Sequence, residues 1–389
     1  MIAFNPLNSY VYSCDDGGVY KSTDNGQTWT SLVEDFEASQ VYHITGTKDN
    51  ANYMLAGLQD NGLIKRESNT SNYDEVIYID GFMMAYAPNC LDTFYSGGNE
   101  ELYRTRDGGT TLDSITPLGP NDKEFFGNVV THNSNKSTVF MGFSNLYKST
   151  NQGSSWTDTG AWGNWALALC PSNSNRIYAA GDSNYTPGIT GQFWRSDNLG
   201  TSWTILQTKP GFPTMTSGTK ITGIGVDPTN SSRVYVCFGG FIEGQKVYRS
   251  FFAGEGWEDW TGSLPNVPAN AIVVDSNQNV YVGTDIGVFF RSQSMSDWMP
   301  YKNNLPNAPV TDFILDEAND RIRCSTFGRG IWSNTLVESC PASLNIVVAQ
   351  SGYRLWQASN QITSTASIVG SENSNIHYQA GTYVLLTPP

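Results

Sequence analysis

A short sequence pattern recurs along this chain of 389 residues and limits the folds open to it. Its clearest copies are GVYKSTDNGQTW at 18–29 and NLYKSTNQGSSW at 145–156. The six copies begin their Ser/Thr-x-Asp core 42 to 54 residues apart, except for a first gap of 83 residues; the cores start at Ser22, Thr105, Ser149, Ser196, Ser250 and Ser292. A period of this length is typical of solenoids and β-propellers, in which each repeat is one supersecondary unit.

The long first gap contains a further unit that lacks the pattern but keeps its strand, at 62–66. The strand recurs alone at 330–333, so the chain holds eight units of roughly 40 to 50 residues. In most units an alternating apolar stretch and a polar turn precede the pattern, which predicts four short antiparallel strands per unit.

These units predict an all-β chain with a seven- or eight-bladed β-propeller over residues 1–338. Eight units are compatible with a full ring, or with seven blades plus one blade of a preceding ring. A small β module, which we expect to be incomplete, follows at 339–389.

The recurring pattern has the chemistry of a tight turn. Asp or Asn at its third position accepts hydrogen bonds from nearby backbone N–H groups, glycine supplies a positive φ, and Ser or Thr adds a local hydrogen bond. The Trp that follows is expected to begin the outer strand and to fill the wedge between neighbouring blades. We therefore assign structural roles to Ser22, Asp24, Gly26, Trp29, Asp107, Gly109, Asn151, Gly153, Trp156, Asn198, Gly200 and Trp203.

The pattern resembles the Asp-box, or BNR, repeat S-x-D-x-G-x-x-W of sialidase-like, sortilin-like and xyloglucanase-type propellers, over about residues 1–338. The resemblance implies the fold more than the reaction, because such propellers include hydrolases, receptors and assembly factors. The Arg-Ile-Pro or Arg-Leu-Pro motif of sialidases is absent. The tail after Cys340 resembles a C-terminal segment common in secreted proteins of the Bacteroidetes.

Asp15 is the candidate catalytic residue. In the xyloglucanase-type glycosidases, the catalytic aspartate lies in a segment that resembles YSCDDGGVY at 12–20. An inverting hydrolase needs a second carboxylate about 6.5–9.5 Å away. The equivalent turns carry Asp60 and Asp285, which we expect to line one face near the axis. A structural turn produces the same recurrence, so no catalytic residue is assigned.

Two tryptophans lie outside both patterns. Trp162 and Trp165, in AWGNW, are predicted in the link between two blades. If exposed, they would stack on a sugar ring or hold a peptide; if buried, they would fill the centre. The candidate ligand-binding residues are therefore Trp162, Trp165, Asp60 and Asp285.

The composition and charge limit the classes of partner and cofactor that this chain is expected to bind. Thirty-six acidic and 22 basic residues give a net charge of −14, which disfavours a nucleic acid partner. Six scattered cysteines and three isolated histidines predict neither a metal site nor a cofactor. No apolar run approaches the 18 residues of a membrane helix, and residues 1–6 do not resemble a signal peptide, so any export signal would lie upstream.

The sequence thus predicts a secreted or cell-surface propeller, part of a longer polypeptide, that binds a glycan or another protein without catalysis. The alternative is a glycoside hydrolase acting on a polysaccharide, with Asp15 and a second carboxylate as acid and base. A structural or adhesion module is the third possibility.

Overall fold

In the computed structural model, the regular elements of the described residues are all strands, apart from a single 3-10 turn at Glu317–Asn319. The structure describes residues 1–15, 18–32, 39–47, 53–67, 73–77, 80–98, 101–117, 128–143, 145–162, 166–181, 192–216, 219–337, 343–346, 353–358, 361–364, 375–380 and 383–386.

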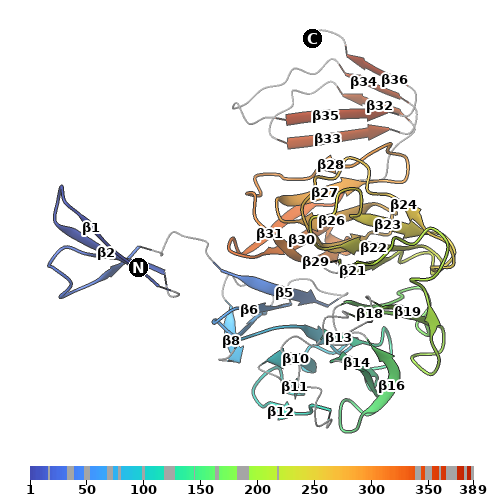
Figure 1. The fold of residues 1–389 in the computed structure, drawn as a ribbon, viewed down its shortest axis with the longest axis horizontal. Coiled ribbons are helices and arrows are strands. Elements are labelled where there is room, and N and C mark those ends of the chain that lie inside the picture. Colours follow the sequence, from blue (N-terminus) through green and yellow to red (C-terminus); the bar gives the residue numbers. More distant parts are fainter. Residues whose placement is uncertain are drawn as a thin grey trace.

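Eight antiparallel sheets follow one another along the chain (Figure 1), seven of four strands and a last one of three. The first is β1–β4 (Ile2–Asn5, Tyr10–Asp15, Gly18–Ser22, Thr30–Ser31). The other seven are called blades 1 to 7. Blades 1, 2 and 3 are β5–β8 (Val41–Gly46, Met54–Leu58, Leu63–Arg66, Asp74–Ile77), β9–β12 (Met84–Tyr86, Phe94–Gly98, Glu101–Thr105, Asp113–Ser114) and β13–β16 (Asn128–Thr131, Val139–Gly142, Asn145–Ser149, Thr157–Trp162). Blades 4, 5, 6 and 7 are β17–β20 (Ala166–Leu169, Ile177–Gly181, Gln192–Ser196, Thr204–Ile205), β21–β24 (Ile221–Val226, Val234–Phe238, Val247–Ser250, Glu258–Asp259), β25–β28 (Ala269–Val274, Val280–Thr284, Gly287–Arg291, Met299–Pro300) and β29–β31 (Val310–Asp316, Arg321–Thr326, Ile331–Thr335).

Blades 1 to 7 close a ring. Their first strands lie side by side in chain order, and β29 of blade 7 packs against β5 of blade 1. At this junction the N–H groups of Gly328 and Gly330 donate to the Ser39 carbonyl at 3.1 and 3.2 Å, and Gln40 forms a β-bridge with Phe327. The predicted propeller is confirmed, and these contacts close it with seven blades. Sheet β1–β4 stands apart from the ring (Figure 1).

The second strand of each blade fills the space on both of its sides. In β22, Val234, Val236 and Phe238 pack toward blade 4, whereas Tyr235 and Cys237 pack toward blade 6; all five are fully buried. Successive side chains of a strand point to opposite faces, so one apolar strand serves two neighbouring cores. Each such side chain contributes about 1.5–3 kcal/mol by leaving water.

The recurring turns are held by their own side chains. In the turn of sheet β1–β4, the Gly26 N–H donates to Ser22 Oγ at 2.8 Å, and the Thr28 N–H donates to Asp24 Oδ1 at 2.9 Å. The same two bonds recur in the turns of Asp107, Asn151 and Asn198. Hydrogen bonds from the following Thr hold the pKa of Asp24 and Asp107 at about 2. Their carboxylates are thus occupied within the turn.

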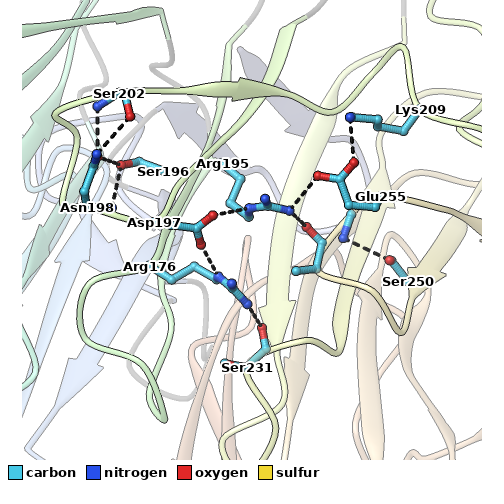
Figure 2. Close-up of polar contacts among 12 residues, drawn as sticks. Arg176, Arg195, Ser196, Asp197, Asn198, Ser202, Lys209, Ser231, Ser250 and Glu255 are labelled. Atoms are coloured by element: carbon cyan, nitrogen blue, oxygen red, sulfur yellow. Dashed lines mark hydrogen bonds and ion pairs between the residues drawn. The ribbon is translucent and has the colours of Figure 1, made fainter.

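A charged network joins these turns across blades 4 and 5 (Figure 2). Asp197 accepts from Arg176 at 2.6 Å and from Arg195 at 2.9 Å. Arg195 also contacts Glu255, which is paired with Lys209 at 2.6 Å. Both arginines are mostly buried while the carboxylates remain partly exposed, so the network ties the two blades at their outer edge.

The tryptophans of the turns wedge between blades, as the sequence predicted, with one exception. Within the ring, three indole N–H groups donate to a carbonyl of the preceding blade: Trp156 to Ile115 at 2.6 Å, Trp203 to Thr159 at 3.1 Å and Trp298 to Trp260 at 2.8 Å. Trp257 packs between blades 4 and 5 without such a bond. Trp29, in sheet β1–β4, is instead 41% exposed. The expectation was wrong there, because the described residues place no blade against it.

The tail forms short strands in two parallel sets: β32, β34 and β36 (Ser343–Ile346, Gln361–Ser364, Tyr383–Leu386), and β33 with β35 (Tyr353–Ala358, Asn375–Ala380). Successive strands alternate between the two sheets. The predicted boundary between residues 338 and 339 lies outside the described residues and stays a prediction.

We expect Trp298→Ala to lower the free energy of unfolding by about 3–5 kcal/mol, because it empties a buried wedge. Trp298→Phe should cost less, since it keeps most of the packing and loses chiefly the hydrogen bond to Trp260. Urea unfolding checks both values. Equal losses for the two variants would contradict a packing role.

The buried carboxyl group of Asp275 predicts that the stability of the fold depends on pH. Burial raises its pKa to about 6, although Asn279 donates two hydrogen bonds to it. The folded chain therefore retains this proton up to about pH 6, whereas an unfolded Asp releases it near pH 4. Stability should fall by on the order of 3 kcal/mol as the pH rises through that interval, and Asp275→Asn should abolish the fall.

Urea unfolding from pH 3.5 to 7.5 measures this effect. The matched control is Asp227→Asn in blade 5, where the carboxylate pairs with Arg233 at 2.8 Å, so neutralising it should destabilise the fold at pH 7. An unchanged pH profile in Asp275→Asn would sink the prediction.

Candidate binding site at the closure of the ring

One face of the ring gathers the starts of the inner strands and the turns between second and third strands. Val41 opens β5 and pairs with Leu58, so the turn at 59–62 lies beside it. Val310 pairs with Thr326 in the same way, next to the turn at 327–330. We call this face the mouth face. The recurring turns that begin at the Ser/Thr-x-Asp cores follow the third strands and lie at the opposite end of the blades.

The inner strands enclose a central channel of about 460 Å³. His43, Asp312 and Asn270, which lie on neighbouring strands of blades 1, 7 and 6, are among its polar lining residues. The opposite arc contains apolar side chains such as Val130 and Leu167. The seam where the ring closes thus contributes His43 and Asp312 to the lining, while Asn128 and Thr131 of blade 3 contribute further polar groups.

Four inner strands carry a β-bulge directly after their first residue. The bulged residues are Tyr42, Thr222, Asn270 and Thr311, and a bulge redirects the side chain that it displaces. Thr311 Oγ donates to the Val41 carbonyl at 2.7 Å, and Asn270 Nδ2 donates to Asp285 Oδ1 at 2.9 Å. The bulges thus direct polar side chains to the mouth face.

An ion pair spans the closing strands. His43 Nε2 lies 3.1 Å from Asp312 Oδ2, which also accepts the Ile44 N–H at 3.1 Å. Burial raises the pKa of Asp312, while the His43 charge and backbone hydrogen bonds lower it. The second ring nitrogen of His43, Nδ1, is buried and has no protein partner.

An aromatic cluster lies beside this pair on the mouth face. The ring of Tyr42 lies 5.2 Å from that of Phe82 and 5.7 Å from that of Phe327. Phe82 is buried, whereas Phe327 is 37% exposed. Burial raises the pKa of Tyr42, and the charges of Asp80 and Asp60 raise it further. Both carboxylates therefore act on the Tyr42 hydroxyl.

The backbone holds these two carboxylates in place. The Asp60 N–H donates to Asp80 Oδ1 at 2.5 Å, and Asp60 has a φ of +57°. A Cβ at Gly81 would lie 2.3 Å from the Gly62 carbonyl oxygen, so only glycine fits this close approach. Asp60 remains exposed. We call Tyr42, Phe327, Asp60 and Asp80 the closure site.

The predicted residues divide between this face and the rest of the chain. Asp60 and Asp285 lie on the mouth face, where Asp285 accepts from Asn270. Asp15 is the last residue of β2, in the sheet outside the ring. Figure 1 shows this strand apart from the blades that carry Asp60 and Asp285. Trp162 is the last residue of strand β16, which corrects its assignment to a link. Trp165 lies outside the described residues.

Sequence reasoning missed Tyr42, Asp80, Phe327 and the His43–Asp312 pair. A signal is present in VYHI at 41–44, ITGI at 221–224, ANAI at 269–272 and VTDF at 310–313, because in these four inner strands a polar residue follows the first position.

Neither a metal centre nor a membrane helix is found in the part of the chain that the structure describes. That part contains no group of three His, Cys, Asp or Glu side chains arranged to hold a metal ion. Its cysteines are free thiols: Cys14, Cys90, Cys170, Cys237 and Cys324. None of its segments is a helix with the length and apolarity to span a bilayer.

Asp312→Ala should lower the free energy of unfolding by about 1–3 kcal/mol, because it leaves the Ile44 N–H and His43 without their acceptor. Asp312→Asn should cost less, since its amide oxygen still accepts one bond. Urea unfolding compares the two, with Asp92→Ala, an exposed turn residue of blade 2, as the control. If Asp312→Ala matches that control, the pair does not stabilise the ring.

The sequence matches no protein-family model and no curated protein. Solved structures match it by fold. A GH74 enzyme of Niastella koreensis aligns with a TM-score of 0.56 at 18% identity, over 85% of this chain and 58% of its own. The chain thus spans little more than half of that enzyme's length.

Two further structures align at similar levels. YCF48 bound to a D1 peptide gives a TM-score of 0.56 at 14% identity, over 78% of this chain and 95% of its own. The extracellular domain of a putative one-component system from B. thetaiotaomicron gives a TM-score of 0.53 at 14% identity, over 76% of this chain and 38% of its own. Likeness at such identities shows the fold alone, and that fold is the β-propeller.

Proposed function

We propose that this chain is a non-catalytic binding propeller, and that its ligand binds at the closure site on the mouth face. The observation that carries the proposal is a partly exposed aromatic pair, Tyr42 and Phe327, placed beside the carboxylates of Asp60 and Asp80 at the ring closure. Binding pockets combine apolar surface with a few fixed polar groups in this way.

Two ligand classes fit these groups. Aromatic faces stack on the apolar face of a sugar ring while carboxylates accept its hydroxyls, and the same groups bind a cationic side chain of a protein. The net charge of −14 favours a protein with a basic surface and disfavours nucleic acid. The solved complex of the YCF48 propeller with a peptide supports a polypeptide ligand, which we place first, with a glycan second.

A glycoside hydrolase is the alternative, and the fold shared with the GH74 enzyme favours it. The position of Asp15, in a sheet that stands apart from the ring, weighs against it. Release of reducing ends from a polysaccharide panel that includes xyloglucan tests this alternative. Release that disappears in Asp15→Asn would replace our proposal with catalysis.

We further propose that the protein acts outside the cell or on its surface, as part of a longer polypeptide. The resemblance of the tail to a segment of secreted Bacteroidetes proteins supports this location, and a propeller of similar fold forms an extracellular domain of a B. thetaiotaomicron protein.

Binding to a peptide library and a glycan array tests the closure site directly. Phe327→Ala and Asp60→Asn should each weaken the affinity about tenfold or more, equivalent to about 1.4 kcal/mol. Asn tolerates the positive φ of Asp60, so this variant removes only the charge. Matched controls away from the mouth face are Phe252→Ala, in an exposed Asp-box-like turn, and Asp92→Asn.

The salt dependence separates the two ligand classes, because screening weakens binding of a charged peptide but not of a neutral glycan. Affinities that match wild type in both Phe327→Ala and Asp60→Asn would rule out the closure site as the place of binding.

A further inference from the structure

Sheet β1–β4 is a complete blade by its hydrogen bonds. Its four strands pair in the order of the ring blades, and its turn carries the full set of Ser22 and Asp24 bonds. The Leu32 N–H donates to the Val19 carbonyl at 2.8 Å, as the Ile115 N–H donates to Leu102 at the same distance in blade 2. The sheet therefore has the construction of a blade that belongs to a ring.

This blade has no ring of its own among the described residues. Blades 1 to 7 already close on each other through β5 and β29, which leaves no place for an eighth blade. Apolar side chains that ring blades bury are exposed here: Ile2 at 74% and Phe4 at 62% on the inner strand, and Trp29 at 41%. By comparison, Val41 and Ile44 on the inner strand of blade 1 are 1% exposed.

The ring shows what covers such a tryptophan. Trp156, Trp203 and Trp298 each bind a carbonyl near the end of the outer strand of the preceding blade. Trp257 packs in the same direction, with Leu206 of the preceding blade in one apolar cluster. In every case the covering blade comes earlier in the chain, by one repeat.

We propose that the exposed face of sheet β1–β4, formed by Ile2, Phe4 and Trp29, docks against a further blade of the same repeat type, supplied by polypeptide N-terminal to Met1. The chain order of the four ring contacts selects this occupant over a second copy of the chain. Sheet β1–β4 is then the last blade of another propeller, joined to blade 1 through residues 32–40. This inference is independent of the ligand at the closure site.

The test compares two tryptophan variants in two polypeptides. Trp29→Ala and the matched control Trp203→Ala are made in residues 1–389 and in the polypeptide that the gene encodes, and thermal unfolding is followed. In residues 1–389, only Trp203→Ala should lower Tm. In the encoded polypeptide both variants should lower it, and Trp29→Phe should recover part of the loss.

Hydrogen exchange of β3 and β4 gives a second readout that needs no variant. The amides should exchange at least tenfold more slowly in the encoded polypeptide than in residues 1–389. Any of three results would overturn the proposal. The amides could exchange equally in the two forms, Trp29→Ala could leave the Tm of the encoded polypeptide unchanged, or the reading frame could start at Met1. A dimer of residues 1–389 that Trp29→Ala dissociates would also overturn it, because the occupant would then be a second copy.

Discussion

The packing of β29 against β5 is the contact on which the rest of the structure depends. The outward faces of the first and last blades are buried only when these two blades pack against each other, and here this contact is non-covalent. The backbone bonds of Ser39 with Gly328 and Gly330, together with the His43–Asp312 pair, hold the junction. Blade 7 has three strands, so the inner strands and the mouth-face turns close the ring instead of an outer strand.

The same junction creates the asymmetry that a binding site requires. A propeller of equal blades would present similar groups all around its axis, whereas here the aromatic and acidic groups meet at one seam. Tyr42 and Phe327 come from opposite ends of the ring's chain, and closure alone brings them within 5.7 Å. The proposed binding residues therefore lie next to the residues that hold the junction, and Phe327 belongs to both through its β-bridge with Gln40.

The fold was predictable from the sequence because each blade is a local unit. The turn of Asp107, for example, is held by hydrogen bonds between residues four positions apart, so the repeated sequence pattern identifies such turns directly. The number of blades was not predictable, because counting units does not reveal which strands lie side by side. Equally, nothing local to Tyr42, Asp80 or Phe327 marks them as neighbours, and Asp15 and Trp29 looked like ring residues because their own blade is built like the others.

A double-mutant cycle on His43 and Asp312 tests the central claim, that the ring closes through β5 and β29, most directly. The free energies of unfolding of His43→Ala, Asp312→Ala and the double variant are measured by urea titration. Closure as described predicts a coupling free energy of roughly 0.5–3 kcal/mol between the two sites. Strictly additive losses would mean that these side chains do not meet in the folded protein, and would contradict the closure.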